Sequence, residues 1–291
     1  MIQEITVLSG KGGTGKTSIT AALAAIAQNA VFSDCDVDAA DLHLLLAPAV
    51  SETHSFSSGS YASIDQDKCN SCGLCMDACR FEAISQPRDG LFVVDRYLCE
   101  GCRLCERLCP VDAITSITNN NNRWYVSETR FGPMVHAQMA AGEENSGKLV
   151  STVRQRARAI AKEQSLETII NDGPPGIGCP VIASLTGVQK VLLVVEPSKS
   201  GLHDLERVAA LCQKFNIPTF AIINKQDLNA EMTQLAEDLL NKLNIPLVGK
   251  LNFDEGFVKA MIKGKTIVEY SPESEVTTTL KQAWKTLFEA N

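Results

Sequence analysis

The sequence predicts an α/β fold: a doubly wound, mostly parallel sheet that carries a smaller inserted α+β domain. Short apolar runs rich in β-branched residues alternate with segments of helical periodicity, which is typical of parallel sheets buried on both faces. A glycine-rich loop stands between the first such run and the first helical segment. A cysteine-rich segment then interrupts the alternation. We therefore expect a sheet domain over residues 1–60 and 119–291, with an insert over residues 61–118.

The elements of the sheet domain follow in order along the chain. Before the insert we expect a strand, a helix and a second strand, over Ile5–Ser9, Lys16–Gln28 and Val31–Asp36. After it we expect strands over Thr168–Asp172, Val191–Glu196 and Phe220–Asn224, and helices over Leu202–Phe215 and Ala230–Leu243. The last segment has an apolar stripe at helical spacing, formed by Leu280, Ala283, Trp284 and Leu287. Because its polar face carries few basic residues, we expect this helix to pack against the sheet rather than on a membrane.

Composition limits the functional classes. The chain has 27 Lys and Arg against 34 Asp and Glu, a formal net charge of −7, and 45% hydrophobic residues. This is apolar enough for a sizeable core, and the acidic balance argues against a general nucleic-acid binder, which needs Lys and Arg at phosphates. The sequence shows no apolar run of about eighteen residues and no leader-like start, so we expect a cytoplasmic protein without stable membrane insertion. In that compartment 11 cysteines indicate metal binding rather than disulfides.

The glycine-rich loop fits the phosphate-binding pattern G-x-x-x-x-G-K-[ST]. Its residues are Gly10, Lys11, Gly12, Gly13, Thr14, Gly15, Lys16 and Thr17, followed by Ser18. The glycines allow backbone N–H groups to surround an anion, and the dipole of the following helix adds to the attraction. We expect Lys16 to reach the β- and γ-phosphates of a nucleotide and the Thr17 hydroxyl to bind Mg²⁺. An ordinary glycine-rich turn would need neither side chain.

The whole loop, SGKGGTGKTS, resembles the deviant Walker A motif of the MinD, ParA and nitrogenase iron protein class of P-loop ATPases. The resemblance implies that Lys11 contacts the nucleotide of a partner subunit in an ATP-dependent homodimer, or in a heterodimer with a paralogue. Two later segments, DCDVD and IINDGPPG, resemble the switches of this class and its Mrp-like branch. Asp36 would orient the attacking water and Asp172 would support Mg²⁺. The candidate catalytic residues are therefore Lys11, Lys16, Asp36 and Asp172.

The segment that would recognise the base leaves two alternatives. Asn224 follows a predicted strand at the position where this class contacts adenine, so the resemblance implies that Asn224 binds the base of ATP. The four residues from Asn224 to Asp227 also spell the guanine-selective N-K-x-D of GTPases, whose aspartate accepts hydrogen bonds from guanine. We favour ATP because Lys11 belongs to an ATPase motif.

Eight cysteines form an internal repeat of C-x₂-C-x₂-C-x₃-C, and each member of the second run lies 30 residues after its counterpart. The runs are Cys69, Cys72, Cys75 and Cys79, then Cys99, Cys102, Cys105 and Cys109. The pattern resembles bacterial two-cluster ferredoxins, in which the fourth cysteine of each run binds the other cluster. The resemblance implies two [4Fe–4S] clusters, one held by Cys69, Cys72, Cys75 and Cys109 and the other by Cys99, Cys102, Cys105 and Cys79. Zinc is the alternative, and the doubled spacing favours the clusters.

The remaining cysteines have different expected roles. Cys212 and Cys35 are expected in the core, whereas Cys179 lies at a spacing from Asp172 at which the nitrogenase iron protein places a ligand of its inter-subunit cluster. No second cysteine of that kind stands upstream, so a shared cluster is not favoured.

Two functions remain open. The first is an ATP-dependent dimer that couples nucleotide state to electron transfer through the clusters. The alternative is a MinD- or Mrp-like regulatory or Fe–S assembly ATPase whose clusters sense redox state or stabilise the fold. Either would work with an unidentified redox or Fe–S partner protein. An amidotransferring synthase is less favoured, since we find no glutaminase Cys–His arrangement.

Overall fold

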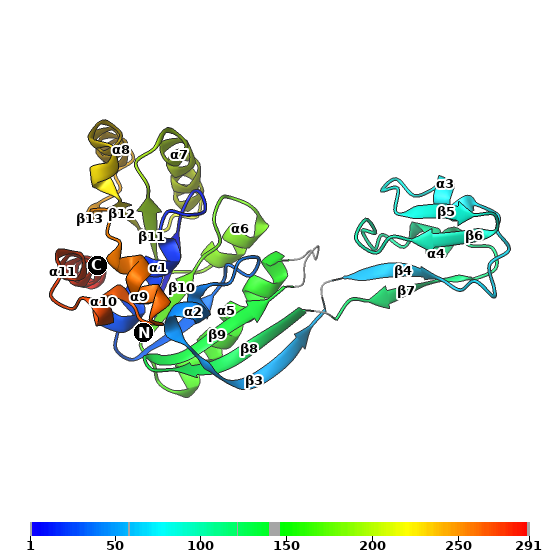
Figure 1. Cartoon of the computed structure of the whole chain (residues 1–291), viewed down its shortest axis with the longest axis horizontal. Coiled ribbons are helices and arrows are strands. Elements are labelled where there is room, and N and C mark those ends of the chain that lie inside the picture. The colour runs from blue at the N-terminus through cyan, green and yellow to red at the C-terminus, as the bar shows by residue number, and fades with distance from the viewer. Residues whose placement is uncertain (1, 58, 121, 140–145, 290–291) are drawn as a thin grey trace. The chain divides into compact units, whose positions relative to one another are not determined.

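The computed structural model describes residues 2–57, 59–120, 122–139 and 146–289 (Figure 1). The chain divides into two compact units. The larger is built from residues 2–54, 124–138 and 146–289, and the smaller mainly from residues 55–123.

A nine-stranded sheet forms the centre of the larger unit. In spatial order its strands are β13 (Leu247–Leu251), β12 (Thr219–Asn224), β11 (Lys190–Val195), β1 (Gln3–Leu8), β10 (Thr168–Asp172), β2 (Ala30–Asp34), β9 (Gly132–Gln138), β8 (Asn122–Thr129) and β3 (Ala49–Phe56). Neighbouring strands from β13 to β9 pair in parallel. The α/β sheet and the five strands predicted from apolar runs are confirmed, with ends shifted by two residues at most.

The register of the sheet brings two carboxylates to one edge. Asp172 pairs with Val7 on one side and with Asp34 on the other. All three residues lie at or next to the carboxyl ends of parallel strands. In open α/β sheets, ligands bind outside this edge.

Helices cover both faces of the sheet (Figure 1). The first face carries α1 (Lys16–Ile26), α2 (Leu42–Leu46), α9 (Gly256–Ile262), α10 (Ile267–Tyr270) and α11 (Glu275–Glu289). The second carries α5 (Ser146–Glu163), α6 (Cys179–Leu185), α7 (Lys199–Lys214) and α8 (Ala230–Lys242). Leu280, Ala283 and Leu287 of α11 are fully buried in the core, so the prediction that this helix packs against the sheet is confirmed.

One arginine ties the edge of the sheet to the first helical layer. Arg130 lies in the short turn between β8 and β9, and its guanidinium donates to the carbonyl oxygens of Leu45 and Leu46, both at 2.9 Å. The same group forms an ion pair with Glu269 of α10 at 2.7 Å. These bonds satisfy carbonyls at the end of α2 that have no partner within the helix.

The smaller unit has two short antiparallel sheets. Strand β4 (Ser60–Ile64) pairs with β7 (Ile114–Thr118), and β5 (Ile84–Arg88) pairs with β6 (Leu91–Val94). Its helices are α3 (Leu74–Asp77) and α4 (Leu104–Leu108). The sequence repeat is also a backbone repeat, because residues 30 apart share the left-handed region. These pairs are Ser71 and Gly101 (φ 60° and 62°), Gly73 and Arg103 (78° and 59°), and Glu82 and Asp112 (54° and 50°).

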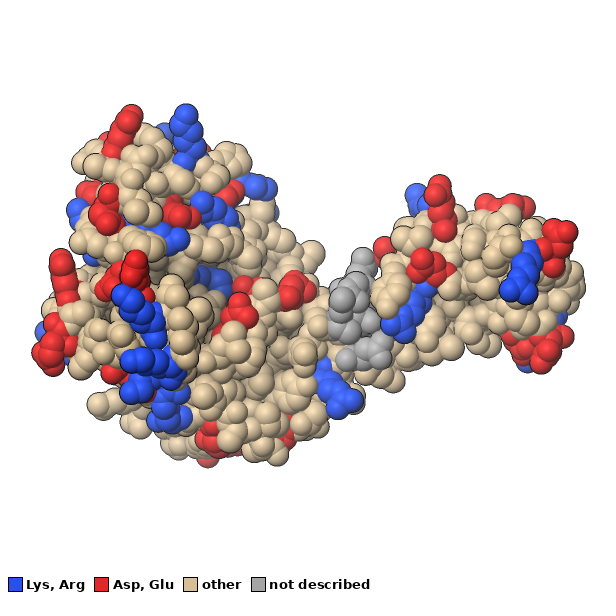
Figure 2. Space-filling view, in the orientation of Figure 1, with Lys and Arg blue, Asp and Glu red and all other residues tan. Residues whose placement is uncertain are grey.

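Charged side chains of both signs are interspersed on the face of the larger unit drawn in Figure 2, with one stripe of basic side chains over α9. Among the residues that the structure describes, no helix is long and apolar enough to cross a membrane.

Candidate functional site

The glycine-rich loop joins the end of β1 to the start of α1 at the carboxyl edge of the sheet. Gly15 has φ +90°, and a Cβ at this position would lie 2.4 Å from Asn224 Nδ2. Only glycine fits this conformation and this contact without strain. Within the described chain no side chain caps the N-terminus of α1. Its first N–H groups are thus suited to bind an anion.

Lys16, the first residue of α1, is 6% exposed and contacts two carboxylates. Its Nζ lies 2.9 Å from Asp172 Oδ1 and 3.4 Å from Asp36 Oδ2. Burial alone would lower the pKa of Lys16, but the neighbouring carboxylates outweigh it and raise the pKa. The structure therefore brings three of the four predicted catalytic residues together, with a cationic lysine at their centre.

Asp172 also accepts hydrogen bonds from two hydroxyl groups of α1. Thr17 Oγ1 donates to Asp172 Oδ2 and Thr20 Oγ1 donates to Oδ1, both at 2.8 Å. Thr17 Oγ1 also accepts from Lys16 Nζ at 3.4 Å, so after these two bonds one lone pair of its oxygen is left to face a cation. Mg²⁺ prefers oxygen ligands and is usually held by one or two side chains together with substrate phosphates. The residues around Thr17 fit this requirement. Ser18 follows on α1 and is partly buried.

Asp34 was not predicted as a site residue, although it organises the segment that contains Asp36. It is fully buried, and its carboxylate accepts from the backbone N–H groups of Asp36 and Leu42, both at 3.1 Å. Burial and the nearby Asp172 carboxylate raise the pKa of Asp34 well above its usual value. Burial also raises the pKa of Asp36. The available sequence signal was that Asp34 ends a buried strand two residues before Asp36.

Lys11 lies on the other side of the loop, against the start of α7. Its Nζ lies 2.7 Å from Glu196 Oε2 and donates to Ser198 Oγ at 3.0 Å. Burial would raise the pKa of Glu196, but its hydrogen bonds and ion pairs with Lys11 and Lys225 lower it. Lys11 is therefore not part of the cluster around Lys16. The position of Glu196 as the last residue of the strand predicted over Val191–Glu196 was the sequence signal for this contact.

The segment after β12 holds the loop from the side. Asn224 Nδ2 donates to Thr14 O at 2.8 Å, and Lys225 Nζ donates to Gly13 O at 2.9 Å. Asp227 Oδ1 accepts from the backbone N–H of Phe253 at 2.6 Å. The hydroxyl oxygen of Thr14 is buried and, within the described residues, has no hydrogen-bond partner. A buried hydroxyl of this kind beside a phosphate-binding loop fits a site that takes a polar ligand.

The cysteines of the smaller unit line two separate hollows. One hollow is lined by Cys69, Cys72, Cys75 and Cys109, together with apolar residues such as Phe92. The other is lined by Cys79, Cys99, Cys102 and Cys105. Each hollow combines three cysteines of one run with the fourth of the other.

The donor set fits an iron–sulfur group. The sulfur atoms of Cys69 and Cys99 each accept from a backbone N–H at 3.4 Å, and that of Cys109 accepts at 3.2 Å. Hydrogen bonds of this kind are among the features that tune Fe–S clusters. In the part of the chain that the structure describes, no three His, Cys, Asp or Glu side chains lie close enough to hold a single metal ion. A four-iron cluster is wider than one ion and spaces its thiolates further apart.

The other three cysteines lie outside these hollows. Cys35 and Cys212 are fully buried, as expected, and burial raises the pKa of their thiols to about 12 and about 11. Cys179 is exposed at the start of α6.

Comparison with known proteins agrees with the architecture of the larger unit. Residues 5–267 match the family model described as the CobQ/CobB/MinD/ParA nucleotide binding domain. The uncharacterized protein MJ0578 of Methanocaldococcus jannaschii is 35% identical over 232 residues, which cover 79% of this chain and 80% of that protein. The septum site-determining protein MinD of Synechocystis is 26% identical over 273 residues, 91% of this chain and 81% of that protein. The structure of MinD from Pyrococcus horikoshii complexed with Mg-ADP is 19% identical, with a TM-score of 0.59 over 99% of this chain and 96% of that one.

Proposed function

The chain belongs to the CobQ/CobB/MinD/ParA nucleotide-binding family, and from this premise we propose that it is an ATPase that acts as a MinD-like nucleotide-dependent switch. The observation that carries the proposal is the contact of Lys16 with both Asp172 and Asp36 at the end of the phosphate loop. ATP is favoured over GTP because the carboxylate of Asp227, which would have to accept hydrogen bonds from guanine, already accepts one from the backbone N–H of Phe253.

Each side chain has a distinct role in the proposed reaction. Lys16 offsets the charge on the phosphates, and Thr17 with Asp172 holds Mg²⁺. Asp36 orients the attacking water. Lys11, which lies apart from this cluster, contributes its charge to the nucleotide of a second subunit in an ATP-dependent dimer. The second subunit is another copy of this chain or a paralogue.

Two substitutions test these roles. Asp36→Asn should keep the affinity for ATP and lose hydrolysis, and the matched control Asp38→Asn changes an exposed carboxylate two residues away. Lys11→Ala should retain ATP binding and lose both hydrolysis and ATP-driven dimerisation, measured by light scattering coupled to size-exclusion chromatography. Equal phosphate release by Asp36→Asn and Asp38→Asn would contradict the role of Asp36. ATP-driven dimers of Lys11→Ala would contradict the action of Lys11 in trans.

We also propose that residues 61–118 form a ferredoxin-like insert that holds two [4Fe–4S] clusters. The support is the crossed composition of the two hollows, each with three cysteines of one run and the fourth of the other. The backbone donors to the sulfur atoms add to it. Such clusters supply one-electron redox chemistry. The protein's own part is to supply the thiolates and the hydrogen bonds around them.

Iron analysis after anaerobic reconstitution tests the clusters. The wild-type protein should bind about eight iron and about eight sulfide per chain, as two four-iron clusters require. Cys109→Ser and Cys79→Ser should each remove one cluster, and Cys109→Ser should alter the same paramagnetic signal as Cys69→Ser. Cys179→Ser is the matched control, because this exposed cysteine lies outside both hollows, and it should keep the full iron content. Binding of zinc without sulfide would contradict the proposal.

Coupling of the clusters to the nucleotide is a second candidate function, and one observation favours it. Asp34 binds the backbone N–H of Leu42, the first residue of α2, and α2 leads through β3 to the smaller unit. Along the chain, only α2, β3 and β4 stand between the segment that contains Asp36 and the first cysteine of the repeat, Cys69. If the protein is an electron carrier, reduced clusters should reduce a partner at rates that differ between ATP and ADP. If it is a redox-sensing switch, cluster oxidation should change the ATPase rate instead.

A further inference from the structure

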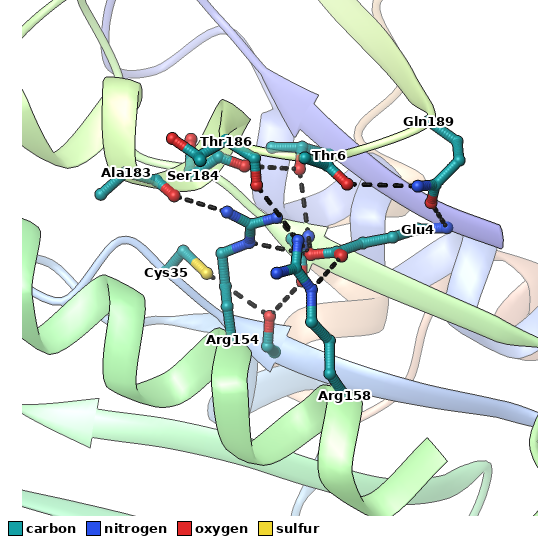
Figure 3. Close-up of polar contacts among 12 residues, drawn as sticks. Glu4, Thr6, Cys35, Arg154, Arg158, Ala183, Ser184, Thr186 and Gln189 are labelled. Atoms are coloured by element: carbon teal, nitrogen blue, oxygen red, sulfur yellow. Dashed lines mark hydrogen bonds and ion pairs between the residues drawn. The ribbon is translucent and has the colours of Figure 1, made fainter. Parts of the chain in front are cut away.

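The buried carboxylate of Glu4 lies on the face of the sheet covered by α5, opposite to the face that carries α1 and Lys16. Glu4 of β1 is 3% exposed and stands between two arginines of α5 (Figure 3). Arg154 Nε and Nη2 donate to Glu4 Oε1 at 2.8 and 2.6 Å, and Arg158 Nε donates to Oε2 at 2.6 Å. Asn171 Nδ2 donates to the same Oε1 at 2.9 Å. Charge-assisted bonds of this number fix the carboxylate and both guanidinium groups in one geometry.

The same group of side chains holds the end of α6. The last carbonyls of a helix have no partner within it, and α6 has no basic residue in its last turn. Three side-chain donors from β1 and α5 form hydrogen bonds to carbonyl oxygens at this end of α6 (Figure 3). They are Arg154 Nη1 to Ala183 O (2.5 Å), Thr6 Oγ1 to Ser184 O (3.0 Å) and Arg158 Nη2 to Thr186 O (3.1 Å). Helix α6 is therefore anchored to the sheet at its far end.

Helix α6 begins directly after the loop that follows Asp172. This loop, residues 173–178, touches the phosphate loop, since Gly176 N donates to Ser9 O at 3.1 Å. Beside Asp172, the Asn171 side chain points away from Lys16 and joins β10 to Glu4 and, through Ser33 Oγ at 2.5 Å, to β2. The loop is thus held at its start by the residues around Asp172 and at its end through α6.

We propose that Glu4, Arg154 and Arg158 are positioning residues for hydrolysis, because they hold α6 and through it the loop over residues 173–178. This inference rests on the proposed ATPase function. The three side chains make no contact with Lys16 or Thr17, so truncating them should leave nucleotide affinity unchanged and lower kcat. A displacement of about 1 Å at a reacting centre can cost about 100-fold in rate, so we expect a loss of about tenfold or more.

The test compares two truncations with a control on the same helix. Arg158→Met removes the bond from one of the three proposed residues to the end of α6 and keeps Arg154 paired with Glu4. Thr6→Val removes a second bond to the same helix end; it also removes the 3.0 Å bond from Asn171 Nδ2 to Thr6 Oγ1, while Asn171 keeps its bond to Glu4. Both variants should fold. Arg156→Met is the control, because Arg156 pairs at the surface with Glu52 and Glu163. For each we measure kcat, the dissociation constant of a fluorescent ATP analogue, and nucleotide-dependent amide exchange of residues 173–178.

The expected result is a lower kcat with unchanged affinity, and weaker nucleotide-dependent protection of residues 173–178, in both truncations but not in the control. Arg158→Lys, which keeps the charge and a donor, should recover part of the rate. Turnover of both truncations at the wild-type rate, or a parallel loss of affinity, would overturn the positioning role. A wild-type protein that binds ATP without hydrolysing it would instead refute the proposed function.

Discussion

Substitution of Gly15 by alanine probes the construction of the phosphate loop. Gly15 has φ +90°, and an added Cβ would stand 2.4 Å from Asn224 Nδ2. The left-handed conformation costs an alanine about 1–2 kcal/mol. Moving the amide of Asn224 would also break its 2.8 Å hydrogen bond to Thr14 O, which is worth about 1 kcal/mol. We therefore expect Gly15→Ala to lower the free energy of unfolding by about 2–3 kcal/mol.

The assay is urea unfolding followed by circular dichroism without nucleotide, with Gly12→Ala as the matched control. A Cβ at Gly12 would meet nothing within 4 Å, so this substitution in the same loop should change stability by less than about 0.5 kcal/mol. Gly15→Ala should move the transition midpoint to lower urea without changing its slope. Equal midpoints for the two variants would refute the argument from the contact with Asn224.

Three further substitutions address other contacts. Burial, with a smaller effect of His43, lowers the pKa of His136 to about 4, so below pH 6.5 the unfolded chain binds a proton that the folded chain does not. This group should therefore lower the free energy of unfolding by about 2 kcal/mol between pH 7 and 5. In urea titrations His136→Gln should lack that part of the decline. Arg130→Lys replaces the planar guanidinium, which reaches Leu45, Leu46 and Glu269, by a single ammonium group. The substitution should lower the free energy of unfolding by about 2 kcal/mol in the same assay, and an unchanged midpoint would show that the guanidinium is not needed. Lys225→Met removes the 2.9 Å bond to Gly13 O and should weaken nucleotide binding about fivefold by calorimetry, whereas wild-type affinity would show that this bond does not shape the loop.

The central strands of the sheet could be predicted from the sequence, whereas the outermost strand β3 could not. Strand β11 is buried along its whole length, and after Lys190 its sequence is a continuous apolar run. Strand β3 is exposed over most of its length and has no such run. Its place in the sheet is set by pairing with β8, far away in sequence, which no local pattern reports.

The candidate site divides in the same way. Lys16 and Thr17 belong to a contiguous motif, and the four cysteines that line each hollow are those that the resemblance to two-cluster ferredoxins implies as one set. Residues whose role depends on tertiary contacts could not be identified from a local sequence pattern. Glu4 meets Arg154 across 150 positions of sequence, and a lone glutamate in a first strand gives no sign of such a partner.

The most direct test of the central claim is release of phosphate from Mg²⁺·ATP by the purified protein and by Lys16→Met. Lys16 is the buried cation between Asp172 and Asp36, and methionine keeps an unbranched side chain one atom shorter while removing the charge. The account predicts slow, Mg²⁺-dependent hydrolysis by the wild type and none by Lys16→Met, with ATP preferred over GTP. Equal phosphate release by the two proteins would contradict it.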